Sequence, residues 1–326
     1  MPVLDGLRAV SILLVLATHM LPVGPKAWQL NDATGNMGMS LFFALSGFLI
    51  VSLLLADTTV PEFLVRRLAR ILPLAYAYTF VVFVLVSFDP ARLFWTNTFL
   101  MNYVDPLNNL IDINAHFWSL CVEMQFYACI ALVVFVLGRR GLWLVFPACI
   151  AITLIRIGHG ATVDIRTHHR VDEILAGACV AMLYRPDWSR FKRMAVVALP
   201  AILVLWFLSA NWMLEPLGYF RPYFSSALLV AALCLQNSAF GRFLASKTLG
   251  YIATISYALY IIHPATIHGW LNEGGPAVKY LLKRPVSFAV TFALAHVSTF
   301  YWESYWQDAG RRLIRRWRSG SAGIAV

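Results

Sequence analysis

The chain has 326 residues, of which 60% are hydrophobic and only 13% are charged. Together with a mean hydropathy of +0.69, this composition excludes an ordinary soluble globular protein and predicts an all-α, polytopic membrane helix bundle. The formal net charge of +10 is typical of a protein whose basic loops face anionic lipid headgroups. We therefore expect membrane lipids as partners and no nucleic acid.

Apolar runs of about 17–22 residues, long enough to cross a bilayer as helices, recur from the first residues almost to the end. They predict ten transmembrane helices, at residues 3–22, 37–56, 71–88, 117–138, 142–158, 171–184, 195–210, 223–240, 249–270 and 285–306. The loops on one side of this layout hold about twice as many Lys and Arg residues as the other loops, which places both termini in the cytosol. We therefore expect an integral membrane domain over residues 1–310 and a basic cytosolic tail over residues 311–326.

Two ionisable side chains lie on one face of the first predicted helix. Arg8 and His19 are eleven positions apart, and at about 100° per residue this spacing returns them to one stripe, about 16 Å apart along the axis. An ionisable group in bilayer hydrocarbon costs on the order of 2.5–3.5 kcal/mol, which favours a cavity lined by both residues over contact with lipid. His19 is thus a candidate general base, and a packed, hydrogen-bonded histidine is the alternative.

A second polar stripe runs along the fourth predicted helix, where His116, Ser119, Glu123 and Tyr127 follow at helical spacing. A carboxylate at the depth of Glu123 requires a partner, and His19 is a candidate because both residues belong to the outer half of the membrane. In that arrangement Glu123 would orient the imidazole and raise its basicity. A buried ionic contact between helices is the alternative.

Three arginines, Arg66, Arg67 and Arg70, precede the third predicted helix on the side assigned to the cytosol. Guanidinium groups bind phosphate through paired hydrogen bonds, so three of them at one corner could hold a phosphorylated donor such as coenzyme A. Anchoring to lipid headgroups is the alternative.

The ninth predicted helix contains the segment ISYALYIIHP, which places Ser256, Tyr260 and His263 on one face, with Tyr257 as a further candidate. Hydroxyl and imidazole groups can line a pocket for an acceptor, although hydrogen bonding between helices is their commoner use. No His or Cys spacing is typical of a metal site, so we expect no metal.

A polar cluster stands at the start of the sixth predicted helix and contains His168, His169, Arg170, Asp172 and Glu173. Charged residues are mostly exposed in proteins. We therefore expect this cluster on solvated surface, with the rim of a pocket as the alternative.

Six segments, taken in order, together resemble the acyltransferase 3 family of integral membrane acyltransferases. They are LDGLRAVSILLVLATH, GMSLFFALSGFLI, VRRLARILPLAY, WSLCVEMQFY, RVDEILAGACVA and ISYALYIIHP. The first resembles the family's Arg-x10-His helix and the third its arginine corner. The chain departs from the pattern at Ser40, where many members have aspartate.

This resemblance implies transfer of an acyl group, commonly acetyl, from cytosolic acyl-CoA to a hydroxyl, often of a sugar outside the cytosol. We expect acetyl-CoA as donor and a carbohydrate, glycan or other small hydroxyl-bearing molecule as acceptor. The resemblance assigns catalysis to His19, Arg8 and Glu123, and coenzyme A binding to Arg66, Arg67 and Arg70. For the acceptor pocket we expect His116, Ser119, Ser256, Tyr257, Tyr260 and His263.

In the expected reaction, His19 removes the hydroxyl proton while the oxygen attacks the thioester carbonyl, and an acyl-histidine intermediate is the less favoured route. A multi-pass transporter or exporter with a buried His, Arg and Glu relay is the alternative function, since it shares the polar stripes. For either function we expect a multi-pass protein of the bacterial cytoplasmic (inner) membrane.

Overall fold

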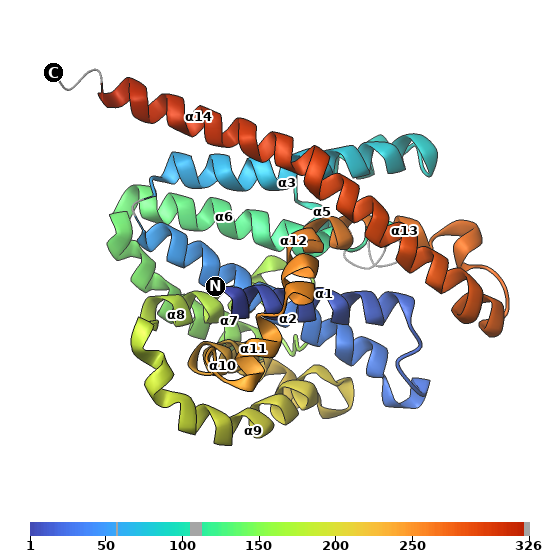
Figure 1. Ribbon diagram of the computed structural model, residues 1–326, viewed down its shortest axis with the longest axis horizontal. Coiled ribbons are helices and arrows are strands. Elements are labelled where there is room, and N and C mark those ends of the chain that lie inside the picture. The colour runs from blue at the N-terminus through green and yellow to red at the C-terminus, as the bar shows by residue number, and fades with distance from the viewer. Residues whose placement is uncertain (57, 105–112, 323–326) are drawn as a thin grey trace.

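The computed structural model describes residues 1–56, 58–104 and 113–322, and every regular element in these ranges is a helix (Figure 1). The all-α class is therefore confirmed. The α-helices are α1 (Pro2–Met20), α2 (Leu30–Leu55), α3 (Val60–Leu85), α4 (Pro90–Asn97), α5 (Met101–Val104), α6 (Phe117–Leu137), α7 (Val145–Gly158), α8 (Asp172–Leu183), α9 (Lys192–Ala210), α10 (Arg221–Cys234), α11 (Ala239–Leu244), α12 (Lys247–Ile262), α13 (Arg284–Val297) and α14 (Ser304–Ala322). Segments of 3₁₀-helix cover Lys26–Trp28, Gly138–Leu144, Thr167–His169, Pro186–Phe191, Trp212–Phe220, Ala265–Ile267 and Gly269–Asn272, and π-helix covers Val278–Lys283 and Ser298–Glu303.

Among the described residues, six helical stretches are long and apolar enough to cross a membrane. They are Pro2–Met20, Leu30–Leu55, Val60–Leu85, Phe117–Gly158, Pro186–Ala210 and Trp212–Cys234. The fourth stretch has 42 residues and covers two predicted helices. The predicted helices at 171–184 and 249–270 contain the shorter helices α8 and α12, and the one at 285–306 covers α13, the π-helix Ser298–Glu303 and the start of α14. None of the three is among the six stretches, so ten crossings and the sides of the termini stay predictions.

The outward faces of the long helices are strongly apolar. Leu85 on α3 is 76% exposed, Phe135 on α6 is 77% exposed and Val197 on α9 is 80% exposed. So much exposed apolar surface is unfavourable in water but matches the hydrocarbon of a bilayer. The chain is an integral membrane protein.

Helix α3 begins earlier than the predicted span at 71–88. The Thr59 side chain accepts a hydrogen bond from the backbone N–H of Glu62, and Pro61 stands in the first turn. Both features favour a helix start at this point. Consequently α3 itself, rather than a corner ahead of it, carries the three arginines of the predicted phosphate site.

Two glycines bring α2 and α8 into direct backbone contact. A Cβ atom at Gly47 would collide with the carbonyl oxygen of Ile174, and one at Gly177 would collide with the carbonyl oxygen of Ala44. Only glycine permits so close an approach of two helices. This contact joins two of the segments that carry the family resemblance.

Helix α1 lies in the middle of the bundle, where it packs against α2 and α12 (Figure 1). Its apolar residues Leu7, Ile12 and Leu16 are buried. Arg8 is half-buried and His19 is exposed. Since α1 is continuous, these two residues lie about 16 Å apart along its axis.

Helix α14 lies alongside α3 (Figure 1). Nε and Nη2 of Arg318 donate to the two carboxylate oxygens of Glu62 at 2.6 Å each, a bidentate geometry that fixes the register of the two helices. The predicted boundary between residues 310 and 311 lies inside this helix.

Candidate active site

Three adjoining cavities, of about 40, 230 and 310 Å³, share Arg70 in their linings. Arg67 lines the first and second, Arg8 the first and third, and Arg66 the second. Arg311 of α14, which no sequence motif singles out, lines the second and third. We call these the arginine cavities. They bring Arg8 together with the three arginines of α3.

Glu123 belongs to the arginine cavities and not to His19. Its Oε1 atom accepts hydrogen bonds of 2.5 Å from the hydroxyls of Ser46 and Tyr127, and the residue lines the smallest of these cavities. The expectation that Glu123 orients His19 therefore does not match the geometry. The helical period placed Glu123 on a polar stripe but could not identify the helix that faces it.

A further cavity, of about 250 Å³, is lined by His19, Trp118, Arg170, Trp212 and Tyr260 among others. We call it the His19 cavity. His19 is exposed there, so a ligand in the cavity has access to its ring.

The hydrogen bonds of His19 assign its tautomer. Nδ1 lies 3.0 Å from the carbonyl oxygen of Val15 and 3.3 Å from Nε2 of His263. Nδ1 of His263 lies 2.8 Å from the carbonyl oxygen of Tyr260. Because a carbonyl oxygen can only accept, both Nδ1 atoms carry the proton, which leaves Nε2 of His19 as a proton acceptor. The partner of His19 is therefore His263 rather than Glu123.

A stacked pair of aromatic rings connects the linings of the two kinds of cavity. Phe42 lines an arginine cavity and Tyr260 lines the His19 cavity. Their ring centroids are 6.3 Å apart, with an interplanar angle of 11°. The Tyr260 hydroxyl donates to the carbonyl oxygen of His116 at 2.6 Å and shares a 2.5 Å hydrogen bond with Ser119. His116 and Ser119 thus hold this wall in place.

The residues expected to form one acceptor pocket are divided between the two kinds of cavity. Ser256 and Tyr257 line an arginine cavity, and the Tyr257 hydroxyl donates to the carbonyl oxygen of Ile71 at 2.6 Å. Tyr260 and His263 lie with His19. Ser256 and Tyr257 are separated from Tyr260 and His263 because α12 runs past both kinds of cavity.

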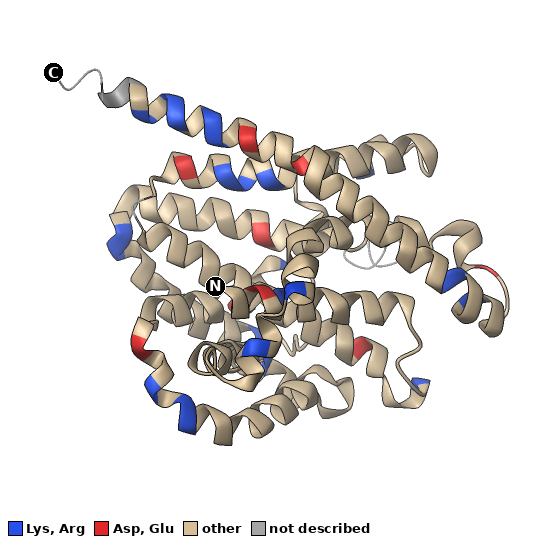
Figure 2. Cartoon of the chain, in the orientation of Figure 1, with Lys and Arg blue, Asp and Glu red and all other residues tan. Residues whose placement is uncertain are grey.

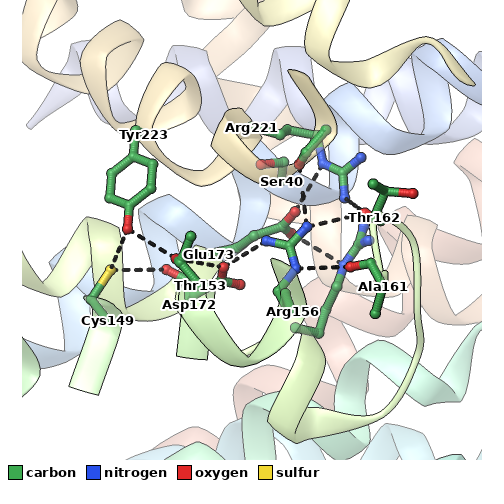
Figure 3. Close-up of polar contacts among 12 residues, drawn as sticks. Ser40, Cys149, Thr153, Arg156, Ala161, Thr162, Asp172, Glu173, Arg221 and Tyr223 are labelled. Atoms are coloured by element: carbon green, nitrogen blue, oxygen red, sulfur yellow. Dashed lines mark hydrogen bonds and ion pairs between the residues drawn. The ribbon is translucent and has the colours of Figure 1, made fainter. Parts of the chain in front are cut away.

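The polar cluster expected on the surface is instead mostly a buried ionic network (Figure 3). Arg156 Nη1 lies 2.6 Å from Asp172, and Arg221 Nε lies 2.9 Å from Glu173. Arg170 Nε lies 3.3 Å from the second oxygen of Glu173. The expectation was wrong because charged groups from α7, α8 and α10 compensate one another inside the protein. The signal that could have found the network is Arg156, a charged residue within an apolar run.

Burial lowers the pKa of Arg170 to about 10. The guanidinium therefore remains charged at neutral pH. This charge stands at the wall of the His19 cavity, with its Cζ atom 5.2 Å from the centre of the Trp118 ring.

This all-helical membrane protein thus has an imidazole and a cluster of arginines in neighbouring cavities. It belongs to the acyltransferase 3 family, whose model, described as an acyltransferase domain, matches residues 1–300.

Two relatives bear the names of acetyl-transferring enzymes. The chain is 27% identical over 311 aligned positions to O-acetyltransferase OatA of Staphylococcus aureus (strain NCTC 8325 / PS 47), covering 81% of this chain and 50% of that protein. It is 24% identical over 371 aligned positions to "Putative O-acetyltransferase SAR0937" of S. aureus (strain MRSA252), covering 98% of this chain and 59% of that protein. The chain thus spans about half the length of the curated relatives it matches. No solved structure matches it.

Proposed function

We propose that the chain is a membrane O-acyltransferase that moves an acetyl group from cytosolic acetyl-CoA to a hydroxyl of a carbohydrate, glycan or other small acceptor at the extracytoplasmic side. One observation carries this proposal. Nε2 of His19 is a free base at an open cavity, and the Tyr260 ring that lines this cavity stacks against the Phe42 ring that lines an arginine cavity. Family membership and the names of the relatives support the same reaction.

The arginine cavities provide the site for the donor. Coenzyme A carries several phosphate groups, and the guanidinium groups of Arg66, Arg67, Arg70 and Arg311 suit bidentate binding of such groups. Figure 2 shows Lys and Arg on α3, on α14 and in the turn after α6 at the same end of the bundle. This asymmetry supports a cytosolic location for that end of the bundle and for both termini of a protein in the bacterial inner membrane.

Transfer takes place where the two kinds of cavity meet. The thioester approaches the wall formed by Phe42 and Tyr260, and the acceptor hydroxyl lies beside His19. Nε2 of His19 takes the hydroxyl proton as the oxygen bonds to the thioester carbonyl carbon, and the carbon–sulfur bond then breaks. The protonated imidazole returns its proton to the departing sulfur, which leaves as the thiol of coenzyme A. General base catalysis of this kind contributes about 10²–10⁴-fold.

The remaining polar residues position these parts. His263 and the Val15 carbonyl oxygen share the Nδ1 proton of His19, while His116 and Ser119 hold Tyr260. In the donor cavities, Glu123 offsets part of the positive charge of Arg8 and its neighbours, which limits their mutual repulsion before the donor binds.

The test is acetyl transfer from labelled acetyl-CoA to a panel of carbohydrates, using purified protein in vesicles. We expect His19→Ala to lower kcat by about 10²–10⁴-fold and Arg70→Ala to raise the KM for acetyl-CoA. His296→Ala is the matched control, because His296 bonds to Tyr251 at 3.0 Å and lines neither kind of cavity. Unchanged transfer by folded His19→Ala protein overturns the proposal, and solute flux without coenzyme A would establish the transporter instead.

A further inference from the structure

Arg170 places a buried positive charge at the wall of the His19 cavity. The residue is 1% exposed. Its Nη1 atom is buried and has no hydrogen-bond partner among the described residues. Its Nε atom lies 3.3 Å from Glu173 but does not meet the geometry of a hydrogen bond. A buried guanidinium normally has partners for its donors, so this one has capacity for a ligand.

The charges of the buried network do not balance. Three arginines, Arg156, Arg170 and Arg221, stand against two carboxylates, Asp172 and Glu173. Each nitrogen of the Arg156 guanidinium donates a hydrogen bond, to Asp172 and to the carbonyl oxygens of Ala161 and Thr162 (Figure 3). A fourth bond goes to a further backbone carbonyl oxygen. Arg221 donates to Glu173 and to the Thr162 carbonyl oxygen. Arg170 and Arg221 therefore share one carboxylate, that of Glu173, and Arg170 also lines the His19 cavity.

We propose that Arg170 binds an anionic group, a carboxylate or a phosphate, on the acceptor sugar whose hydroxyl His19 deprotonates. This inference rests on the proposed function and specifies its acceptor as an acidic carbohydrate. An anion at this place adds a second counter-charge for Arg170 and Arg221, which share the carboxylate of Glu173.

The rest of the cavity suits a sugar ring. Trp212 is 53% exposed and lines the cavity together with Trp118, so aromatic surface is available to the apolar face of a ring. Asp32 is exposed at the same cavity, where its carboxylate can accept hydrogen bonds from sugar hydroxyls. A volume of about 250 Å³ is below the usual range for drug-sized ligands, which favours a single monosaccharide unit.

The test measures binding rather than turnover, so its outcome does not depend on the transfer reaction. Glucuronate, glucose 6-phosphate and glucose are titrated against the purified full chain by calorimetry. We expect wild-type protein to bind at least one of the two anionic sugars about tenfold or more tightly than glucose, because a charge-assisted pair replaces a neutral contact. The two anionic probes distinguish a carboxylate from a phosphate as the preferred group.

Variants then locate the anion. Arg170→Gln should abolish the preference for anionic sugar, and Arg170→Lys should restore part of it. Arg166→Gln is the matched control from the same loop, since that guanidinium is 44% exposed and pairs with Asp164. Trp212→Ala, at an exposed position, should weaken the binding of anionic and neutral sugars alike.

The inference is overturned if wild-type protein binds glucose as well as the anionic sugars, or if it binds none of them. It is also overturned if folded Arg170→Gln keeps the preference. If Arg170→Gln does not fold, the preference of the wild-type protein for anionic sugars and the sugar binding of Trp212→Ala still test the inference. A separate assay that detects no acetyl transfer by the wild-type protein would count against the proposed function alone, because anion binding requires no acetyl-CoA.

Discussion

Nε2 of His263 lies 3.3 Å from Nδ1 of His19, and the two ring centroids are 5.1 Å apart. The contact joins α1 to the end of α12 across 244 positions of sequence. Because Nδ1 of His263 carries its proton toward the Tyr260 carbonyl oxygen, its Nε2 is an acceptor. The Nδ1 proton of His19 is thus shared between His263 and the Val15 carbonyl oxygen.

His263→Ala should lower kcat for acetyl transfer about tenfold, as expected when one hydrogen bond that orients a catalytic group is lost. The Val15 carbonyl oxygen still favours the same tautomer, so activity is reduced rather than abolished. The KM for acetyl-CoA should not change. His263→Asn keeps an acceptor and should recover part of the rate, whereas a merely structural role would predict no such recovery.

Arg311→Gln should raise the KM for acetyl-CoA about tenfold, which corresponds to one charge-assisted hydrogen bond of about 1.5 kcal/mol. Arg311 lines two of the arginine cavities. The neighbouring Arg312 lines none of the three, so Arg312→Gln is the control for loss of one positive charge from α14. Equal effects of the two substitutions would refute a donor site at Arg311.

Phe42→Ala should open the wall between the cavities and increase the hydrolysis of acetyl-CoA relative to transfer. Removing the ring leaves space in which water can reach the thioester, and a closed site normally excludes water from a reactive group. The measurement is the ratio of free acetate to acetylated acceptor. Phe88→Ala removes a ring that is 79% exposed and serves as control. An unchanged ratio in folded Phe42→Ala would show that the stacked pair does not separate the two substrates.

Gly177→Ala should destabilise the protein by about 1–3 kcal/mol or more, since the added Cβ collides with the Ala44 carbonyl oxygen and forces α2 and α8 apart. Gly250→Ala is the matched control within a helix, because a Cβ at Gly250 meets nothing within 4 Å. That substitution should stabilise by about 0.5–1 kcal/mol through helix propensity. Thermal unfolding in detergent measures both, and similar effects would argue against the close crossing.

The part of the site that the sequence could predict is which side chains lie together on one helix. The period of an α-helix placed Arg8 and His19 on one helix, and α1 carries both. Among the described residues, the single cavity expected between them is not found, because Arg8 lines the arginine cavities and His19 lines a different one. Arg66, Arg67 and Arg70 are close in sequence, so their clustering at one cavity could be predicted in the same way.

Relationships between helices could not be predicted from these patterns. Glu123 was paired with His19 because both belong to the same half of the membrane, yet Glu123 bonds to Ser46 and Tyr127. The ionic network was missed for the same reason. Burial of Arg170 and its neighbours is favourable only when charges from three helices meet, and composition does not reveal such a meeting.

The backbone contact at Gly47 and Gly177 also determines which part of the site can move. Phe42 is carried by α2, and Arg170 lies two residues before the start of α8, so both residues are attached to one stiff frame. Tyr260 belongs to α12, outside that frame. In the proposed transfer, the helix that can move to bring the two substrates together is therefore α12 with its tyrosine, while the backbones of α2 and α8 stay in place.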